Sequence, residues 1–222
     1  KQGFNRVNWE LNYPDKRGER LDGYGDGIGT GNIMVTPGTY NVTLVKRVDG
    51  ATTVLQGPEE FQGRPMYEGA LPRKPYDEFD QFREEVFAFQ QDLNATNLMM
   101  SNQMNKVMAM KRAANKTLGD NDVLLSDIDK ARLRLLAIQK ELQGDRLKGE
   151  IGERSNPTPN DGNRIAYSAL NNTYGPTGNH KASLKRARKQ LQGVKSQLKS
   201  MANTTMPNIE QRLKQAGAPW ID

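Results

Sequence analysis

The chain has 222 residues, of which 35% are hydrophobic, and it carries a formal net charge of +6 at pH 7. The length allows one large domain or two small ones, and the low apolar content favours elongated helices and exposed loops over a compact enzyme. Cysteine is absent, which excludes disulfide bonds, thiolate catalysis and metal sites built from cysteine. No apolar run reaches the roughly 18 residues of a membrane span, so we expect no transmembrane segment.

The N-terminal region begins with an alternating pattern that predicts a β-strand. In the stretch VNWELNY, every second residue is apolar, namely Val7, Trp9, Leu11 and Tyr13. Such alternation is typical of a strand with one buried face, and the proline that follows would end it. We therefore expect Trp9 to face an apolar layer.

A β-hairpin is predicted farther along the chain. Tyr40, Val42 and Leu44 alternate with polar residues, and the dipeptide Asp49-Gly50 is a strong turn signal. The residues TTVLQG supply the returning strand, and Ile33–Val35 is a candidate for one more. Three or four strands are fewer than the roughly seven of a sandwich. We expect a partial β-sandwich in residues 1–65, with an apolar face too large for these strands to bury.

A glycine-rich stretch, GYGDGIGTGN, lies between these strands. Its alternate glycines fail the G-x-G-x-x-G spacing of a dinucleotide site. A tightly turning loop is the interpretation that we favour. Calcium binding in residues 22–32, through Asp22, Asp26 and backbone carbonyls, stays open, although the spacing of an EF-hand is missing.

The remainder of the chain predicts helices. Residues 66–75 belong to a proline-rich connector, after which apolar residues recur every three or four positions. This period predicts helices over about 76–118, 124–144 and 184–213, the last with a kink or fresh start at Pro207. Residues 149–178 read as a long irregular loop with one short helical stretch near 164–170. We expect residues 76–222 to form one helical region.

The charge pattern predicts how these helices pack. The stop signal Gly119-Asp120-Asn121 makes the first two helices an antiparallel pair, and the third would run parallel to the first. The acidic residues 77–92 would then lie beside the basic residues 181–199. The fold class that follows is α+β, a partial β-sandwich followed by a long three-helix antiparallel bundle or coiled-coil tail.

Candidate catalytic residues are few. His180 is the only histidine and has no second histidine or cysteine with which to share a metal or activate a nucleophile. Acidic residues cluster on a helix surface instead of at strand ends, where a glycosidase pair would be expected. We therefore expect no catalysis, cofactor or metal site in this chain. Met99 and Met110 lie off the main apolar stripe and could meet a third helix or a partner.

Basic residues suggest one alternative function. No acidic residue occurs from Asn179 to Ile209, and this stretch includes Lys185, Arg188 and Lys189. Such a helix could bind nucleic acid or another anionic surface. It lacks the aromatic residues that stack on bases, and the acidic helix offers a nearer partner. We therefore favour an interaction module over a nucleic-acid binder.

Several segments resemble a known class of proteins. The order NRVNWELNYP, TPGTYNVTL, RSNPTPNDGNRIAYSALNNTYG and TMPNIEQRLKQAGAPWID is similar to the C-terminal region of large secreted bacterial proteins of the Bacteroidota type. Those proteins carry sortilin-like BNR β-propellers and are often labelled glycosyl hydrolase-like. The most distinctive matches are Pro37–Tyr40 and the strand residues Asn5, Trp9, Leu11, Tyr13 and Pro14.

The resemblance implies both an architecture and a function. A propeller would precede a small immunoglobulin-like module and a helical tail, and this chain would be the C-terminal part. The implied role is a non-catalytic structural and interaction module, secreted or at the bacterial cell surface. It would dock on the propeller or on subunits of an outer-membrane complex. A second alternative is an accessory part of a hydrolase whose active site lies upstream. The residues expected to make these contacts are Trp9, Leu11, Tyr13, Tyr40, Val42, Lys185, Arg188 and Lys189.

Overall fold

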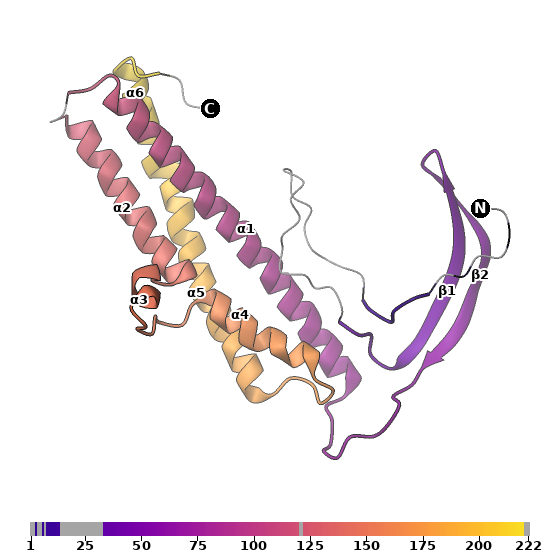
Figure 1. Ribbon diagram of the computed structural model, residues 1–222. Helices are drawn as coiled ribbons and strands as arrows, with labels where there is room; N and C mark the ends of the chain where they lie inside the picture. The colour runs from indigo at the N-terminus through magenta and orange to yellow at the C-terminus, as the bar shows by residue number, and fades with distance from the viewer. Residues whose placement is uncertain (1–2, 4–5, 7, 14–32, 120–121, 220–222) are drawn as a thin grey trace. The chain divides into compact units, whose positions relative to one another are not determined.

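The computed structural model describes residues 3, 6, 8–13, 33–119 and 122–219. The fold is mixed, as predicted, with a β-hairpin and a larger helical part (Figure 1). The chain divides into two compact units. The first unit is Lys1–Glu84 with Leu170–Pro176, and the second unit is Glu85–Ala169 with Thr177–Asp222.

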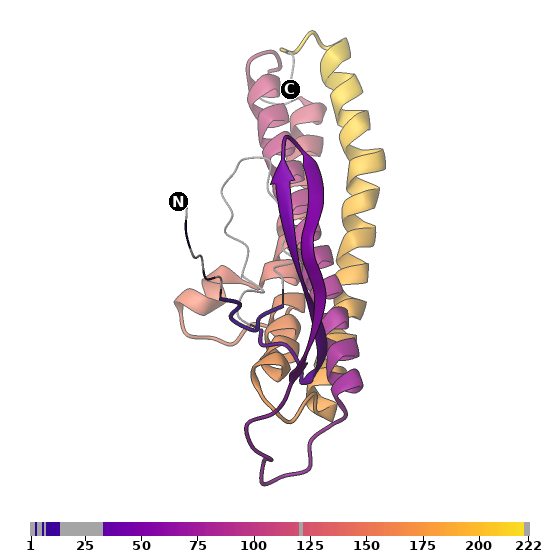
Figure 2. The same cartoon turned by 90° about the vertical axis from the view of Figure 1, so that its right-hand side faces the viewer.

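The first unit contains a long antiparallel hairpin (Figure 2). Strand β1 (Gly38–Val48) pairs with strand β2 (Ala51–Gly63). Asp49 and Gly50 both have positive φ, at 49° and 82°, as a two-residue turn of the primed type requires. The predicted turn is confirmed, and the returning strand continues past the residues TTVLQG through Pro58 to Gly63.

The strand β2 accommodates its extra residues by two shifts of register. The shifts lie between Val42 and Leu44 and between Leu44 and Val45 of the opposite strand. Gly57 lies at the first of them with φ at 98°, and a Cβ built on it would be 2.6 Å from the carbonyl oxygen of Val42. Both facts make this position unsuitable for any other residue.

We expect the substitution Gly57→Ala to destabilise the hairpin by about 1–3 kcal/mol, since alanine there is strained and collides with β1. The measurement is amide hydrogen exchange of residues 39–48, which should become faster. Gly38→Ala is the matched control, because a Cβ at Gly38 meets nothing within 4 Å. Unchanged exchange in the Gly57 variant would contradict the expectation.

The predicted strand at residues 7–13 is wrong for the part that the structure describes, residues 8–13. This segment forms only an isolated antiparallel bridge, between Asn12 and Met34. Leu11 has φ at 56°, which interrupts the extended backbone on which the alternation of side chains depends. Val7 and the proline that was expected to end the strand lie outside the described residues, as does the whole 22–32 loop.

Three of the predicted helices are present. They correspond to α1 (Tyr76–Asn115), α2 (Val123–Gln143) and α5 (Gly178–Ser200) with α6 (Met206–Gln215). The buried residues of α2 are the predicted stripe, Leu124, Ile128, Ala131, Leu135, Ile138 and Leu142. In the second unit, α2 is linked to its neighbours by two ion pairs, Lys111–Asp129 at 2.6 Å and Arg212–Asp127 at 2.8 Å.

Ion pairs also show the direction of α5 relative to α1. Arg188 pairs with Glu85, and Lys195 pairs with Asp92, each with a separation of 103 residues. The equal separation means that the two helices run parallel, as their charges predict. Farther along, Lys106 pairs with Glu210 at a separation of 104.

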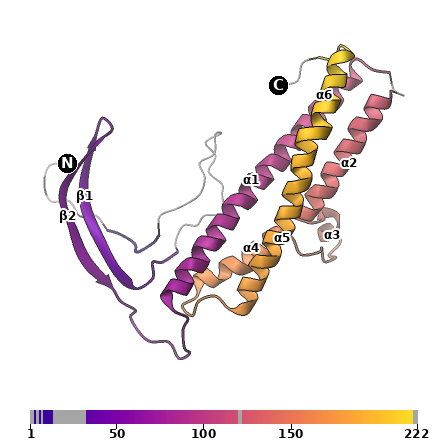
Figure 3. The same cartoon turned by 180° about the vertical axis from the view of Figure 1, so that it is seen from behind.

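The separation between paired residues thus increases from 103 to 104 along the two helices, which means that one additional residue is accommodated. It lies in a π-helical turn, Met201–Thr205, that joins α5 to α6. A π turn holds one more residue than an α turn. The amide of Met206 donates to the carbonyl of Met201, and Pro207 falls in the first turn of α6, where its missing N–H is not needed. Of the predicted kink or fresh start at Pro207, the structure has a new α-helical segment that begins at Met206, and α6 continues the line of α5 (Figure 3).

The predicted loop at 149–178 is only partly irregular. It contains the helix α4 (Pro159–Ser168) and a short 3-10 turn, Ala169–Asn171. A capping box begins α4, since the Asp161 amide donates to Thr158 Oγ1 and the Thr158 amide donates to Asp161 Oδ2. The short helix α3 (Arg146–Glu150) precedes the loop. Because this stretch is rich in glycine, proline and asparagine, its composition predicts a loop instead of the helix α4.

Helix α4 packs closely on α5 through a glycine. A Cβ on Gly162 would lie 2.6 Å from the Cβ of Ala187 and 3.0 Å from the carbonyl oxygen of Ser183. Glycine therefore sets the distance between these two helices.

We expect Gly162→Ala to lower the free energy of unfolding by about 1–3 kcal/mol, because the two helices must separate. The matched control is Gly193→Ala in α5, where a Cβ would meet nothing within 4 Å and alanine favours the helix. Thermal unfolding followed by far-ultraviolet circular dichroism should show a lower midpoint for the first variant only. Equal midpoints would contradict a close α4–α5 contact.

Acid should weaken the contacts of α2. A hydrogen bond from Arg212 lowers the pKa of Asp127, and one from Lys111 lowers the pKa of Asp129. Carboxylates with a lowered folded-state pKa stabilise the fold above their unfolded pKa of about 3.9, and this effect is lost as the pH falls through the folded value.

We expect the melting temperature to fall as the pH drops below about 4, and the double variant D127N/D129N to show a smaller fall. The variant D49N, in the hairpin turn, is the control and should keep the pH dependence of the original chain. An identical dependence in the double variant would contradict the role of these two carboxylates.

Candidate interaction surface on the hairpin

The hairpin is open to solvent along almost its whole length. Every residue of β1 except Tyr40 is exposed, and on β2 only Gly57, Phe61 and Gly63 are partly covered. The exposed residues include large apolar side chains, with Val42 at 56% and Leu44 at 58% exposure. Further members of this group are Val45, Val48, Val54 and Leu55.

The strand pairing gathers much of this apolar surface on one face. Tyr40 lies opposite Phe61, and Val42 and Leu44 follow on the same strand at two-residue intervals. We call the residues Trp9, Tyr40, Val42, Leu44 and Phe61 the apolar face of the hairpin. The alternation predicted for Tyr40, Val42 and Leu44 is therefore present, but its side chains are not buried.

Trp9 contacts the hairpin through its ring. The centroid of the indole lies 5.6 Å from that of Tyr40 and 5.9 Å from that of Phe61, and Tyr40 stacks on Phe61 at 5.7 Å. Edge contacts of this kind are favourable. Trp9 nevertheless remains 48% exposed, and Leu11 remains 43% exposed. The neighbours of the indole are local aromatic rings, and about half of its surface is available to another molecule.

A polar anchor lies beside this cluster within the first unit. Tyr13 and Thr36 each donate a hydrogen bond to Asp80, at 3.0 Å, and Arg83 donates to the same carboxylate at 2.6 Å. The guanidinium of Arg83 also lies 3.4 Å from the ring centroid of Tyr13, a cation–π contact. Tyr13 is thus part of a polar network and not of the apolar face.

Tyr40 joins the anchor to the apolar face. Its hydroxyl donates to the carbonyl oxygen of Thr36 while its ring contacts Trp9. Burial raises the pKa of the Tyr40 phenol, and the hydrogen bond to Thr36 partly opposes this. The base of the hairpin is therefore fixed by specific contacts, and its far part is not.

The three basic candidates lie in the second unit and differ from one another. Arg188 donates to the Glu85 carboxylate at 2.9 Å and to the Glu85 carbonyl at 3.2 Å. Lys185 and Lys189 are exposed and form no ion pair with any residue that the structure describes. Arg188 thus holds two helices together, and only the two lysines present free charge.

Several important residues were not singled out by the sequence. Phe61 completes the aromatic cluster, and it could have been found by extending the returning strand past Pro58. Thr36, Asp80 and Arg83 form the anchor with Tyr13, but they are separated from it by 23, 67 and 70 residues. No periodic pattern signals such a long-range contact.

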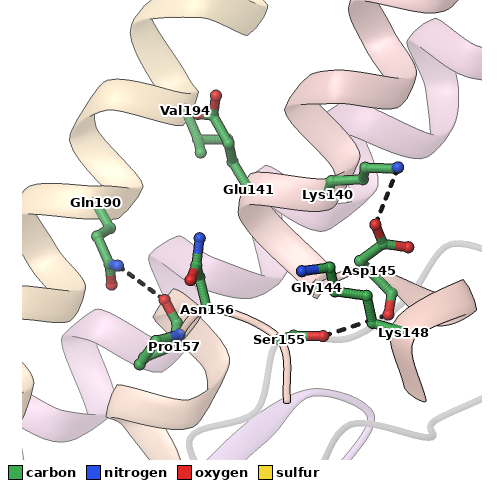
Figure 4. A pocket seen from close by; sticks show the side chains of 10 residues that line it. All are labelled: Lys140, Glu141, Gly144, Asp145, Lys148, Ser155, Asn156, Pro157, Gln190 and Val194. Atoms are coloured by element: carbon green, nitrogen blue, oxygen red, sulfur yellow. Dashed lines mark hydrogen bonds and ion pairs between the residues drawn. The ribbon is translucent and has the colours of Figure 1, made fainter. Parts of the chain in front are cut away.

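A cavity of about 410 Å³ lies in the second unit where α2, α3 and α5 meet (Figure 4). Its polar groups largely serve the fold. Lys140 pairs with Asp145 at 3.0 Å, and Gln190 donates to the carbonyl of Pro157 at 2.9 Å. Ser155 donates to the backbone of Asp145 at 3.3 Å. These bonds hold the loop after α3 in place.

A shallow apolar hollow lies elsewhere on the second unit, between α1 and the π turn. It is lined by Leu98, Met99 and Ala202, among others. Met99 is therefore partly open to solvent, whereas Met110 is fully buried. The two methionines off the main stripe thus have different surroundings.

Searches for known relatives add no assignment. The chain matches no protein-family model, and comparisons with curated proteins and with solved structures give no match. Among the residues that the structure describes, no helix is long and apolar enough to span a membrane. The same residues contain no group of three or more acidic or histidine side chains placed to hold a metal ion.

Proposed function

We propose that this chain is a non-catalytic interaction module that docks through the apolar face of the hairpin. The observation that carries the proposal is the exposure of this face, where Val42, Leu44 and half of Trp9 lie open to solvent. Burying one such side chain contributes about 1.5–3 kcal/mol. A partner that covers the face would therefore gain a substantial hydrophobic contribution.

The stability of the hairpin supports the same proposal. A sheet of two strands is marginal in water, and a third strand or a packed layer is normally needed. The polar anchor and the aromatic cluster fix only the base of the hairpin. The residues from Val42 to Val54 are exposed and belong to a sheet of two strands among the described residues.

The resemblance noted in the sequence supports a specific setting. In that setting the hairpin belongs to an immunoglobulin-like β-sandwich whose other strands come from the propeller-bearing parent or from a subunit of an outer-membrane complex. The protein would act in secreted form or at the bacterial cell surface. The helical part, proposed as a three-helix bundle of α1, α2 and α5–α6, would serve as its rigid support.

One observation favours a second candidate, binding of nucleic acid or an anionic surface. Lys185 and Lys189 are exposed on one helix without an acidic partner in the described part of the chain. The nearby Arg188 and Lys195, however, are engaged by Glu85 and Asp92. Helix α5 also has no aromatic residue of the kind that stacks on bases, so the apolar face is the stronger candidate. An accessory role beside an upstream hydrolase site would use the same face.

The test is photo-crosslinking in the native organism, with a photoreactive amino acid at Val42. Leu133 on α2 is the matched control, because its exposure of 57% equals that of Val42 within 1%. We expect adducts at Val42, and not at Leu133, to a polypeptide that mass spectrometry identifies as a propeller or as a subunit of an envelope complex. Adducts to nucleic acid, or equal yields at both positions, would contradict the proposal.

A further inference from the structure

We infer that two copies of this chain pair through the outer edges of their β1 strands, antiparallel to each other. This inference rests on the proposed function in one respect, since both require that the hairpin is not covered by its own chain. It concerns the edge of the sheet, whereas the proposed docking surface is its apolar face. The occupant of the edge is a second copy of this chain.

The two edges of the hairpin are not equivalent. After Gly38, β1 contains neither glycine nor proline up to Val48. In contrast, β2 carries Gly57-Pro58 near its middle and both shifts of register. Proline has no N–H to donate, and bulges bend a strand away from regular pairing. Only β1 therefore offers an uninterrupted row of backbone donors and acceptors.

Proteins normally protect such an edge. Charged residues, prolines, bulges or a covering segment prevent edge-to-edge association. The irregular β2 has this protection, whereas on β1 the only charged residues are Lys46 and Arg47, at its turn end. Among the described residues, β1 has one hydrogen-bonded neighbour, β2. An open edge with high β-propensity is suited to accept another strand.

The distribution of charge identifies the partner. Lys46 and Arg47 lie opposite Thr53 and Thr52 near the turn, whereas Glu59 and Glu60 lie opposite Val42 and Asn41 toward the base. The turn end stays net positive even with Asp49 in the turn. The hairpin therefore has a basic end and an acidic end.

A second copy of this chain has a charge distribution that complements that of the first. In an antiparallel pairing of β1 with β1, the basic end of each copy lies beside the acidic end of the other, and a two-fold axis relates them. A parallel pairing would place like charges together, which is unfavourable. The pairing would produce a four-stranded sheet, which meets the minimum for independent stability.

The absence of cysteine allows a direct test by single cysteine substitutions. Leu44→Cys lies on β1, and Leu55→Cys on β2 is the matched control, since the two leucines are 58% and 54% exposed. Under mild oxidation we expect covalent dimers of the first variant and not of the second. A residue near the two-fold axis lies opposite the same residue of the other copy, and the Cβ atoms of residues opposite each other on paired strands are close enough for a disulfide bond.

The same approach reports the direction of pairing. Cysteines placed in turn at residues 40, 42, 44, 46 and 48 should give a yield that peaks at one position and declines toward both ends. Equal yields at all positions would mean a parallel pairing and would overturn the antiparallel assignment. Efficient dimers of the Leu55 variant would overturn the assignment to β1.

Charge reversal provides a second measurement, by sedimentation velocity on the cysteine-free chain. R47E and E60R should each raise the dimer dissociation constant about 5-fold or more at low salt, and the double variant should restore most of the affinity. The control R186E, on the exposed side of α5, should leave the constant unchanged.

Hydrogen exchange on the same samples separates the two proposals. A monomer in which the outward-facing β1 amides, those not bonded to β2, exchange freely would overturn self-pairing and leave the proposed docking function intact. A monomer in which these outward-facing amides are protected would mean that the chain covers its own hairpin, and both proposals would fail. A dimer in which Leu44→Lys restores free exchange of these amides supports the inference.

Discussion

The apolar side chains of the hairpin cannot be buried by the hairpin itself, and this constraint explains why the first unit has an exposed apolar surface. Two strands provide two faces but no interior, so Val42 and Leu44 remain exposed however regular the pairing is. The chain places its specific contacts at the base, where Tyr40 reaches both Trp9 and the Thr36 backbone. A fixed base with an exposed remainder is the arrangement that the proposed interaction module would need.

The second unit has no such deficit. Each of its long helices buries a continuous stripe, and the contacts between helices combine apolar packing with ion pairs that set direction and register. The π turn at Met201–Thr205 has a clear place in this arrangement. It takes up one residue, so that α6 stays in register with α1 although Pro207 cannot continue the α5 hydrogen-bond pattern. The helices of the second unit therefore bury their apolar stripes against one another.

Periodic patterns predicted the parts of the fold that depend on them. The helices α1, α2 and α5 were predictable because one residue in three or four is apolar over many turns, and the hairpin turn because Asp49-Gly50 suits positive φ. The strand at 7–13 failed because a single residue, Leu11, leaves the extended region. Helix α4 was underestimated because it begins with a capping box in a stretch rich in turn residues. The anchor around Asp80 depends on contacts between distant segments, which no local pattern encodes.

The placement of opposite charges has the same physical role at two levels of this molecule. On the helices, acidic residues gather in the first half of α1 and basic residues occur along α5, so attraction favours the parallel direction that Arg188–Glu85 and Lys195–Asp92 display. On the hairpin, the basic and acidic residues lie at opposite ends, so attraction between two copies favours the antiparallel direction. Exposed pairs of this kind contribute little energy individually. Their effect is to bias the choice between arrangements that apolar contacts and backbone hydrogen bonds stabilise to a similar extent, since antiparallel strand pairing is only slightly more stable per residue than parallel pairing.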